Sequence, residues 1–328
     1  MSKIFSSLQL NSKIIKNRLA VAPMTTQQSN SDGTISIEEA TWLERLADDG
    51  YGLIISCASA ISNTSIAFHN QLSLANDNMI VGLAQLSERM RIHNSINIIQ
   101  LCHGGSRAIE SLTEIKPHSA SSYTMPMIAN FVPPETLSVK QIEEIIFDFA
   151  NACERVSKAG FDGVELHGAN GYLFTQFIST MTNLRNDNYG GDLINRARFA
   201  REVVQACRKK VPKDFIIGFR ISFESMGLET GLDIDENIQI INWLAEDGID
   251  YVHTSHMSYT AKTNKYPDKI ALQYLRSKIT PTLPLIGVGG ILNNMDAEKA
   301  MEYGADIVAV GRAAIGNKQL PKYFKERK

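Results

Sequence analysis

The sequence predicts a single (β/α)8 TIM barrel over residues 1–328, with an N-terminal β-hairpin closing one end. Eight apolar segments are each followed by a helical stretch, and most are near-continuous apolar runs. Such runs are typical of parallel strands that are buried on both faces. The length of 328 residues with 44% apolar residues suits one large barrel with a substantial core. A doubly wound sheet is disfavoured because no G-x-G-x-x-G motif follows the first strand.

Capping and turn residues mark where several of the expected strands and helices begin and end. A ribbon in residues 1–17 turns at Asn11-Ser12, and the first strand ends at Pro23, which cannot donate to a strand ladder. Ser138 begins a helix with Gln141 in the capping-box position. Strands are expected to begin near residues 19, 53, 96, 163, 215, 249, 284 and 307, and helices over 37–49, 78–92, 138–159, 193–210, 235–247, 267–278, 296–303 and 319–326. The stretches 102–136 and 168–191 are read as loops, and the first is too long for a mere connection.

Composition excludes several classes of function. A net charge of −2 gives no electrostatic reason to expect nucleic acid or an anionic membrane as a partner. The four cysteines are far apart without a C-x-x-C pair, which argues against a metal site or a disulfide scaffold. The N-terminus lacks a signal-peptide core, and no run approaches the ~18 apolar residues of a membrane span. We expect a cytoplasmic protein with a small-molecule substrate, and whether it forms a homo-oligomer stays open.

The clearest chemical signal is a glycine pattern after the last two strands. Barrels often bind phosphate with these two loops and a helix start. Glycines let backbone N–H groups approach the oxyanion, and an arginine adds charged donors. The alternative is that the glycines only mark tight turns. The sequence therefore predicts a phosphate site from Gly289, Gly290, Gly311 and Arg312.

Two further polar side chains belong to apolar strands. Gln100 is a lone amide in the third strand, and Arg220 ends the fifth. A buried amide needs hydrogen-bond partners, which the edge of a flat heterocycle would provide. Each residue alone is more often structural. In a barrel with a phosphate site, the two together indicate a phosphorylated planar cofactor.

The stretch 164–172 follows the fourth strand and carries the candidate catalytic groups. His167 and Asn170 are three residues apart, so a helical turn would place both on one face. Such a pair offers two donors to one acceptor atom, and Tyr172 adds a proton source. The alternative is that these polar residues lie at an ordinary strand end and are simply exposed to solvent. A metal site is disfavoured because asparagine is a poor transition-metal ligand and no ligand cluster accompanies it.

Together these motifs resemble those of the old yellow enzyme family over residues 3–320. These proteins are FMN-dependent NAD(P)H:flavin oxidoreductases and ene-reductases. The resemblance implies a ping-pong reaction in which hydride passes from NADPH or NADH to non-covalent FMN and then to an activated alkene, a nitro compound or a quinone. The motifs are Asn17-Arg18, Ala22-Pro23-Met24-Thr25, Gln100-Leu101-x-His103-x-Gly105, Glu165 to Tyr172 with Gln176-Phe177, Asn183-x-Arg185-x-Asp187-x-Tyr189-Gly190-Gly191, Gly289-Gly290 and Gly311-Arg312.

The resemblance also implies a role for each residue. The residues along the flavin ring would be Pro23, Met24, Thr25 and Ala58. Gln100 would bind the pyrimidine edge of the ring, and Arg220 would lie near its N1 and O2 atoms. The phosphate would be held by Gly289, Gly290, Gly311 and Arg312. His167 and Asn170 would hold the substrate oxygen on which negative charge builds, and Tyr172 would protonate the α-carbon. The Asn183-to-Gly191 loop would support the site structurally.

The chain departs from some members of that family. Asn170 and Thr25 follow the His–Asn and Pro-Met-Thr subtype, but Thr26-Gln27-Gln28 offers no aromatic residue where some members have one. No cysteine lies in residues 23–30, which argues against covalent flavin attachment, and the iron–sulfur and FAD modules of longer relatives are not expected. A flavin-binding sensor or sequestering protein without turnover, and another FMN barrel dehydrogenase, remain the alternatives.

Overall fold

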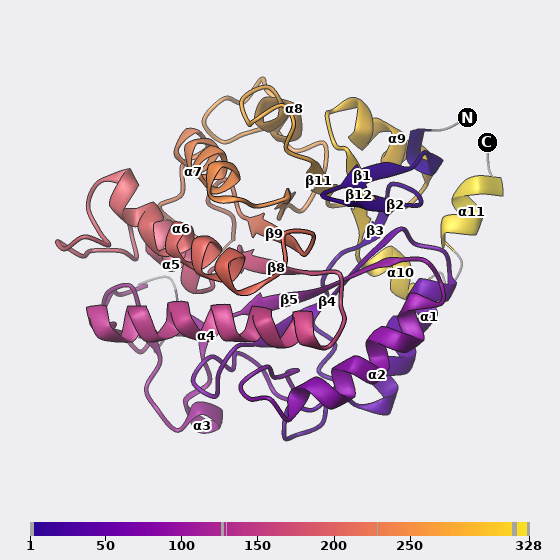
Figure 1. Ribbon diagram of the computed structural model, residues 1–328. Helices are drawn as coiled ribbons and strands as arrows, with labels where there is room; N and C mark the ends of the chain where they lie inside the picture. The colour runs from indigo at the N-terminus through magenta and orange to yellow at the C-terminus, as the bar shows by residue number, and fades with distance from the viewer. Residues whose placement is uncertain (1–2, 126–127, 129, 228, 317–319, 327–328) are drawn as a thin grey trace.

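Eight parallel strands form a closed barrel in the computed structural model (Figure 1), which confirms the predicted fold. The structure describes residues 3–125, 128, 130–227, 229–316 and 320–326. Every strand of the barrel is parallel to both of its neighbours. In barrel order the strands are β3 (Leu19–Val21), β4 (Leu53–Ala60), β5 (Ile96–Cys102), β8 (Gly163–Gly168), β9 (Ile216–Ile221), β10 (Tyr251–Thr254), β11 (Leu285–Val288) and β12 (Ile307–Val310).

Helices connect the strands and lie outside the barrel (Figure 1). The longest, α4, shows why they do. Its buried residues Ile142, Ile145, Phe149 and Val156 recur at three- to seven-residue intervals and form one apolar stripe, and Ser138 and Gln141 make the predicted capping box. The helices between barrel strands are α1 (Ile37–Asp48), α2 (Met79–Arg91), α4 (Val139–Lys158), α6 (Leu193–Lys210), α7 (Ile234–Asp247), α8 (Ala271–Arg276) and α9 (Asn294–Glu302), and α11 (Leu320–Glu326) follows β12.

The N-terminal ribbon covers the end of the barrel at which the strands begin. Strands β1 (Leu8–Leu10) and β2 (Lys13–Ile15) pair antiparallel, as predicted. Leu10 and Ile15 are fully buried and pack in one apolar cluster with Leu53, Ile96 and Tyr251 at the first residues of three strands. The ribbon therefore closes this end and leaves open the opposite end, at which TIM barrels carry their active sites.

Three local predictions need correction. The helix expected over 267–278 is α8 (Ala271–Arg276), because residues before it form a turn and Ile270 pairs with Lys262 in an isolated bridge. The stretch 168–191 contains α5 (Leu173–Ile178). The expected helix 319–326 is described from Leu320, and residue 319 lies outside the described residues.

The long stretch 102–136 contains short elements of its own. They are η2 (Gly105–Arg107), α3 (Glu110–Thr113), β6 (His118–Ser119) and β7 (Glu135–Thr136), of which the two strands pair with each other. Two more short helices, η1 (Lys3–Phe5) and α10 (Arg312–Gly316), lie near the chain ends. Short elements of this kind have little periodicity to reveal them in sequence.

Candidate active site

A row of polar side chains crosses four neighbouring strands inside the barrel. Glu165 and His167 are two residues apart on β8 and therefore point to the same face of the sheet. The strand register places His167 opposite Arg220, and Arg220 opposite His253 on β10. Gln100 on β5 lies opposite Glu165. The barrel thus aligns ionisable groups that are far apart in the sequence.

Glu165 is the centre of this row. Its carboxylate accepts hydrogen bonds from Gln100 Nε2 at 2.8 Å, from Tyr251 Oη at 3.0 Å and from the His253 ring Nδ1 at 2.9 Å. Burial alone would raise the pKa of Glu165, but His253 and Arg220 outweigh it and leave that pKa below its usual value. Burial lowers the pKa of His253, so the ring donates as neutral imidazole. The row therefore holds one carboxylate and one guanidinium, which compensate each other's charge.

A cavity of about 230 Å³ opens directly above this row, at the carboxyl ends of the strands. Eight of its nine lining residues are ones that sequence reasoning singled out, and the ninth is Arg107 from η2. The others are Pro23, Thr25, Ala58, Gln100, His167, Asn170, Tyr172 and Arg220. The remaining predicted cofactor residues, Met24, Gly289, Gly290, Gly311 and Arg312, do not line this cavity.

Asn170 reaches the cavity by a different route from the one the sequence suggested. The expected helical turn does not form, because β8 runs on to Gly168 and Asn170 takes a left-handed conformation with φ 60°. Ser222 Oγ accepts a hydrogen bond from the Asn170 backbone N–H at 3.0 Å, and Ser255 Oγ donates to Asn170 Oδ1 at 2.9 Å. With its oxygen occupied, the amide presents its NH2 group, for which the described residues provide no hydrogen-bond acceptor.

The protonation states of the other two candidate residues follow from burial. Burial, reinforced by the positive charge of Arg220, lowers the pKa of His167 well below its usual value. The imidazole is therefore neutral at neutral pH and keeps one N–H donor. Burial raises the pKa of Tyr172 to about 12, so its phenol is protonated. The two rings lie 4.9 Å apart between centroids, and the Arg107 guanidinium lies 4.6 Å from the Tyr172 ring centre.

Two buried nitrogen atoms at this cavity lack partners among the described residues. They are Nε of Arg220 and Nδ1 of His167. A buried polar atom without a partner is costly, and a ligand can supply what the protein does not. A planar heterocycle with acceptor atoms along its edge would supply a partner for the Arg220 Nε, so the residues present suit a flavin, and a substrate oxygen would supply one for His167.

The predicted phosphate residues lie on neighbouring loops. Strands β11 and β12 pair side by side, with Val288 opposite Ala309, so the loops after them are adjacent. Gly289 has φ 109°, and a Cβ there would lie 2.6 Å from the His256 carbonyl oxygen, so a side chain does not fit. Arg312 is exposed at the start of α10 and forms no ion pair within the described part of the chain. This arrangement leaves a guanidinium and glycine backbone available to an anion.

Comparison with known proteins agrees with this geometry. The NADH:flavin oxidoreductase / NADH oxidase family matches residues 3–328. The chain belongs to this family, that of the old yellow enzymes. Members of the family depend on FMN and use NADH or NADPH.

Individual old yellow enzyme relatives differ in how much of them the chain covers. It is 33% identical over 317 residues to an NADPH dehydrogenase of Clostridium acetobutylicum, covering 96% of this chain and 92% of the relative. It is 35% identical over 314 residues to an NADH:fumarate oxidoreductase of Klebsiella pneumoniae, covering 93% of this chain but 34% of the relative. The chain thus spans about a third of that longer protein. A solved structure of morphinone reductase superimposes with a TM-score of 0.88 at 27% identity, covering 99% and 90% of the two chains.

The Asn183-to-Gly191 motif of the family is structural in this chain. Asn183 Nδ2 donates to the carbonyl oxygens of Phe177 and Tyr189, both at 2.7 Å. Arg185 pairs with Asp187 at 2.6 Å. These bonds fold the segment against α5, which follows Tyr172 directly. The segment therefore supports the loop that carries Tyr172 from outside, as predicted.

Several residues at the site escaped the sequence reasoning. Glu165 had a usable signal, because it lies two residues before His167 in an apolar strand and must share its face. Arg107 had none, since it lies in the short helix η2, whose position depends on the fold. Glu229, which accepts a hydrogen bond from the Gly171 N–H next to Asn170, had none either, because it lies in an irregular segment. His103 of the Gln100-Leu101-x-His103-x-Gly105 motif shapes its own loop, because its ring accepts a hydrogen bond from the Gly105 N–H at 3.0 Å. No helix among the described residues is long and apolar enough to cross a membrane.

Proposed function

We propose that this protein is an FMN-dependent, NAD(P)H-driven ene-reductase that acts on activated alkenes, with nitro compounds and quinones as further acceptors. The observation that carries the proposal is the convergence of His167, Asn170 and Tyr172 on one cavity above Arg220. A protein that only stored or sensed flavin would have no use for two oriented donors and a proton source there. The expected partner is a small molecule, with no nucleic acid or membrane involved.

The donor pair suits an oxygen atom on which negative charge develops. His167 is neutral and buried, and the Asn170 NH2 group is free to donate because Ser255 occupies the amide oxygen. Ser255 holds the Asn170 amide and the His167 ring is buried against Tyr172, so both donors should need little reorganisation during reaction. Removing one such donor typically costs about 10²–10³ in rate. The pair would therefore hold the carbonyl or nitro oxygen of the substrate.

Tyr172 is placed to complete the reduction. When bound, FMN supplies the hydride that the alkene accepts, taken from NAD(P)H in an earlier step. Reduction of a C=C bond also needs one proton at the α-carbon. The Tyr172 phenol keeps its proton to about pH 12 and lines the same cavity as the donor pair. It can give that proton to substrate and recover it from solvent.

The cofactor would be held by residues around this cavity. Pro23, Met24, Thr25 and Ala58 would contact the ring system, and Gln100 and Arg220 its polar edge. The Arg220 guanidinium is buried and positive beside Glu165, which favours a ligand that gains electron density. Gly289, Gly290, Gly311 and Arg312 would bind the phosphate.

The test is cofactor uptake followed by steady-state kinetics. The purified protein should take up FMN non-covalently, so that acid precipitation releases all flavin into solution. The loaded protein should then oxidise NADPH or NADH with 2-cyclohexenone as acceptor and give cyclohexanone. Parallel double-reciprocal plots are expected from a ping-pong sequence. Protein that binds FMN but turns over neither nicotinamide would instead support a flavin sensor, and protein that binds no FMN would contradict the proposal.

A further inference from the structure

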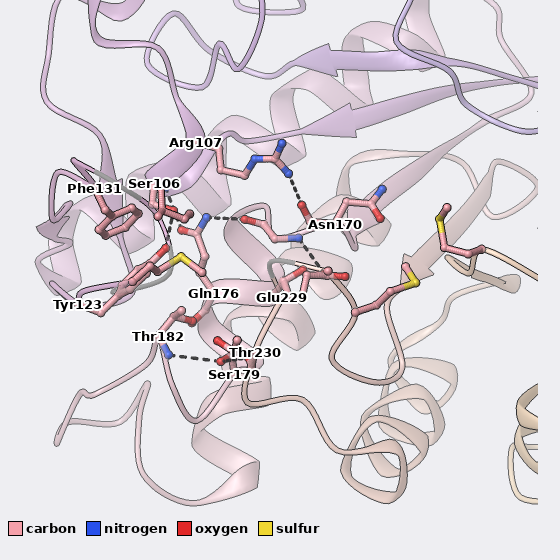
Figure 2. A pocket seen from close by; sticks show the side chains of 17 residues that line it. Ser106, Arg107, Tyr123, Phe131, Asn170, Gln176, Ser179, Thr182, Glu229 and Thr230 are labelled. Carbon is pink, nitrogen blue, oxygen red and sulfur yellow. Dashed lines mark hydrogen bonds between the residues drawn. The ribbon is translucent and has the colours of Figure 1, made fainter. Parts of the chain in front are cut away.

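A second, larger hollow adjoins the catalytic cavity. This chamber has a volume of about 520 Å³, within the range of small-molecule binding sites. Arg107 and Asn170 line both spaces, so the two hollows meet at these residues. Figure 2 shows Asn170 on one wall of the chamber and Tyr123 with Phe131 on the opposite wall. The opposite wall comes from the long segment that follows β5.

Most of the polar side chains in the chamber wall already form hydrogen bonds within the protein. Gln176 Oε1 accepts from Ser119 Oγ at 2.8 Å, and its Nε2 donates to the Gly171 carbonyl oxygen at 2.8 Å. Tyr123 Oη and Ser106 Oγ share a hydrogen bond of 2.7 Å (Figure 2). Two more wall hydroxyls are similarly engaged, with Ser179 Oγ donating to Thr230 O and Thr182 Oγ1 to Gln176 O. Among the buried hydroxyls of the wall, Thr175 Oγ1 lacks a partner within the described residues.

The remaining wall is apolar and adaptable. Met125, Met226 and Met257 contribute three thioether side chains, and Ile128 adds an aliphatic one. Methionine is flexible and makes favourable sulfur contacts with aromatic rings. Tyr123 and Phe131 present an aromatic pair with ring centroids 5.5 Å apart. This surface suits an aromatic ring better than it suits a polar group.

The charges at the chamber cancel. Among the lining residues, Arg107 is the only basic one and Glu229 is the only acidic one. Arg107 donates to the Asn170 carbonyl oxygen, and Glu229 Oε1 accepts from the Gly171 N–H at 2.8 Å (Figure 2). Each charge is thus committed to the loop that carries Asn170. An ionised ligand group would find no unmatched counter-charge here, and its desolvation would be costly.

We propose that the chamber binds an uncharged aryl substituent of the substrate, and that the protein prefers aryl-substituted enones to small cyclic ones. This inference rests on the proposed ene-reductase function and adds the substrate class. The reacting C=C–C=O unit would lie in the cavity beside His167 and Asn170. The aryl group would pass Arg107 and enter the space between Met226 and the Tyr123–Phe131 pair.

Binding can be tested without turnover. The FMN-loaded, oxidised protein is titrated by calorimetry with trans-4-phenylbut-3-en-2-one in the absence of nicotinamide, so that no reduction occurs. Met226→Trp fills the chamber from a partly exposed position without removing a hydrogen bond, and should weaken aryl binding at least about tenfold. Phe131→Ala removes the facing ring and should weaken it as well. The matched ligand 2-cyclohexenone, which needs the catalytic cavity alone, should show a much smaller change in both variants.

Kinetics then separate the two proposals. The ratio of kcat/KM for the phenyl enone to that for 2-cyclohexenone should fall about tenfold in Met226→Trp, mainly through KM. If the wild type reduces neither enone but Met226→Trp still weakens aryl binding, the ene-reductase function fails and the aryl site stands. If both enones are reduced but neither variant, folded and flavin-loaded, changes aryl binding or the ratio, the aryl site is refuted and the function stands.

Discussion

Ser255 Oγ donates a hydrogen bond to Asn170 Oδ1 at 2.9 Å and so joins the end of β10 to the loop after β8. These residues are 85 positions apart in the sequence. The bond sets which end of the amide faces the cavity, because an occupied oxygen leaves the NH2 group as the free end. Asn170 therefore presents a hydrogen-bond donor to the cavity because Ser255 occupies its amide oxygen.

Replacing Ser255 with alanine should therefore weaken the oxygen-binding pair without removing it. We expect alkene reduction to slow by about tenfold, less than the roughly 10²–10³ expected for deleting a donor outright as in Asn170→Ala. Ser255→Thr keeps the hydroxyl and should retain most of the rate. Single-turnover reduction of 2-cyclohexenone measures this order. Equal rates in Ser255→Ala and the wild type would show that the amide orients itself.

Tyr172→Phe removes the proposed proton donor and leaves the ring. The rate of alkene reduction should fall by about 10² or more, while reduction of the bound flavin by NAD(P)H should be affected far less. Because the Tyr172 pKa is raised to about 12, the wild-type alkene rate should show no decline near the ordinary tyrosine pKa of about 10. Stopped-flow measurement of both half-reactions checks this. Unchanged alkene reduction in the variant would exclude Tyr172 as the donor.

Glu165→Gln tests the buried charge balance beneath the cavity. The substitution removes the carboxylate that keeps the Arg220 guanidinium compensated and introduces an NH2 group beside the Gln100 and Tyr251 donors. Breaking a buried charge pair costs about 3–5 kcal/mol of unfolding free energy. Tyr251→Phe is the matched control, since it removes a single hydrogen bond worth about 1 kcal/mol. Urea denaturation should separate the two variants, and equal losses would mean that the charge balance contributes little.

Acid should destabilise the protein through its buried neutral histidines. Burial lowers the pKa of His103 to about 3, against about 6.5 in the unfolded chain. A depressed pKa contributes stability that is present above about pH 6.5 and is lost as pH falls from there towards 3. By pH 5.5 the loss from this one residue is about 1.4 kcal/mol.

His103→Gln checks this pH dependence, because its amide oxygen can still accept from the Gly105 N–H while it cannot titrate. The unfolding free energy of the variant should drop about 1.4 kcal/mol less between pH 7.5 and 5.5 than that of the wild type. Urea denaturation at the two pH values gives both slopes. Identical slopes would mean that the folded His103 accepts a proton in this range.

The barrel could be predicted because its signals are local. Runs such as Ile98-Ile99 in β5 and Ile216-Ile217 in β9 are apolar on both faces, and α4 carries its capping box and apolar stripe within one segment. Eight repetitions of strand and helix have few topological solutions. The strand ends then locate the catalytic rim, and with it most residues of the cavity.

What the sequence by itself determined is the barrel, the ribbon that closes it, and the candidate residues at the strand ends. The tertiary structure alone decided how they act together. The carboxylate of Glu165, the hydroxyl of Ser255 and the guanidinium of Arg107 come to the site from separate strands and loops, and nothing in their local sequence specifies the partners they meet. The position of Asn170 also depends on a distant residue, because Ser222 holds the left-handed turn through a hydrogen bond to the Asn170 N–H. Strand register and loop packing are long-range properties, and they convert a list of polar residues into an oriented site.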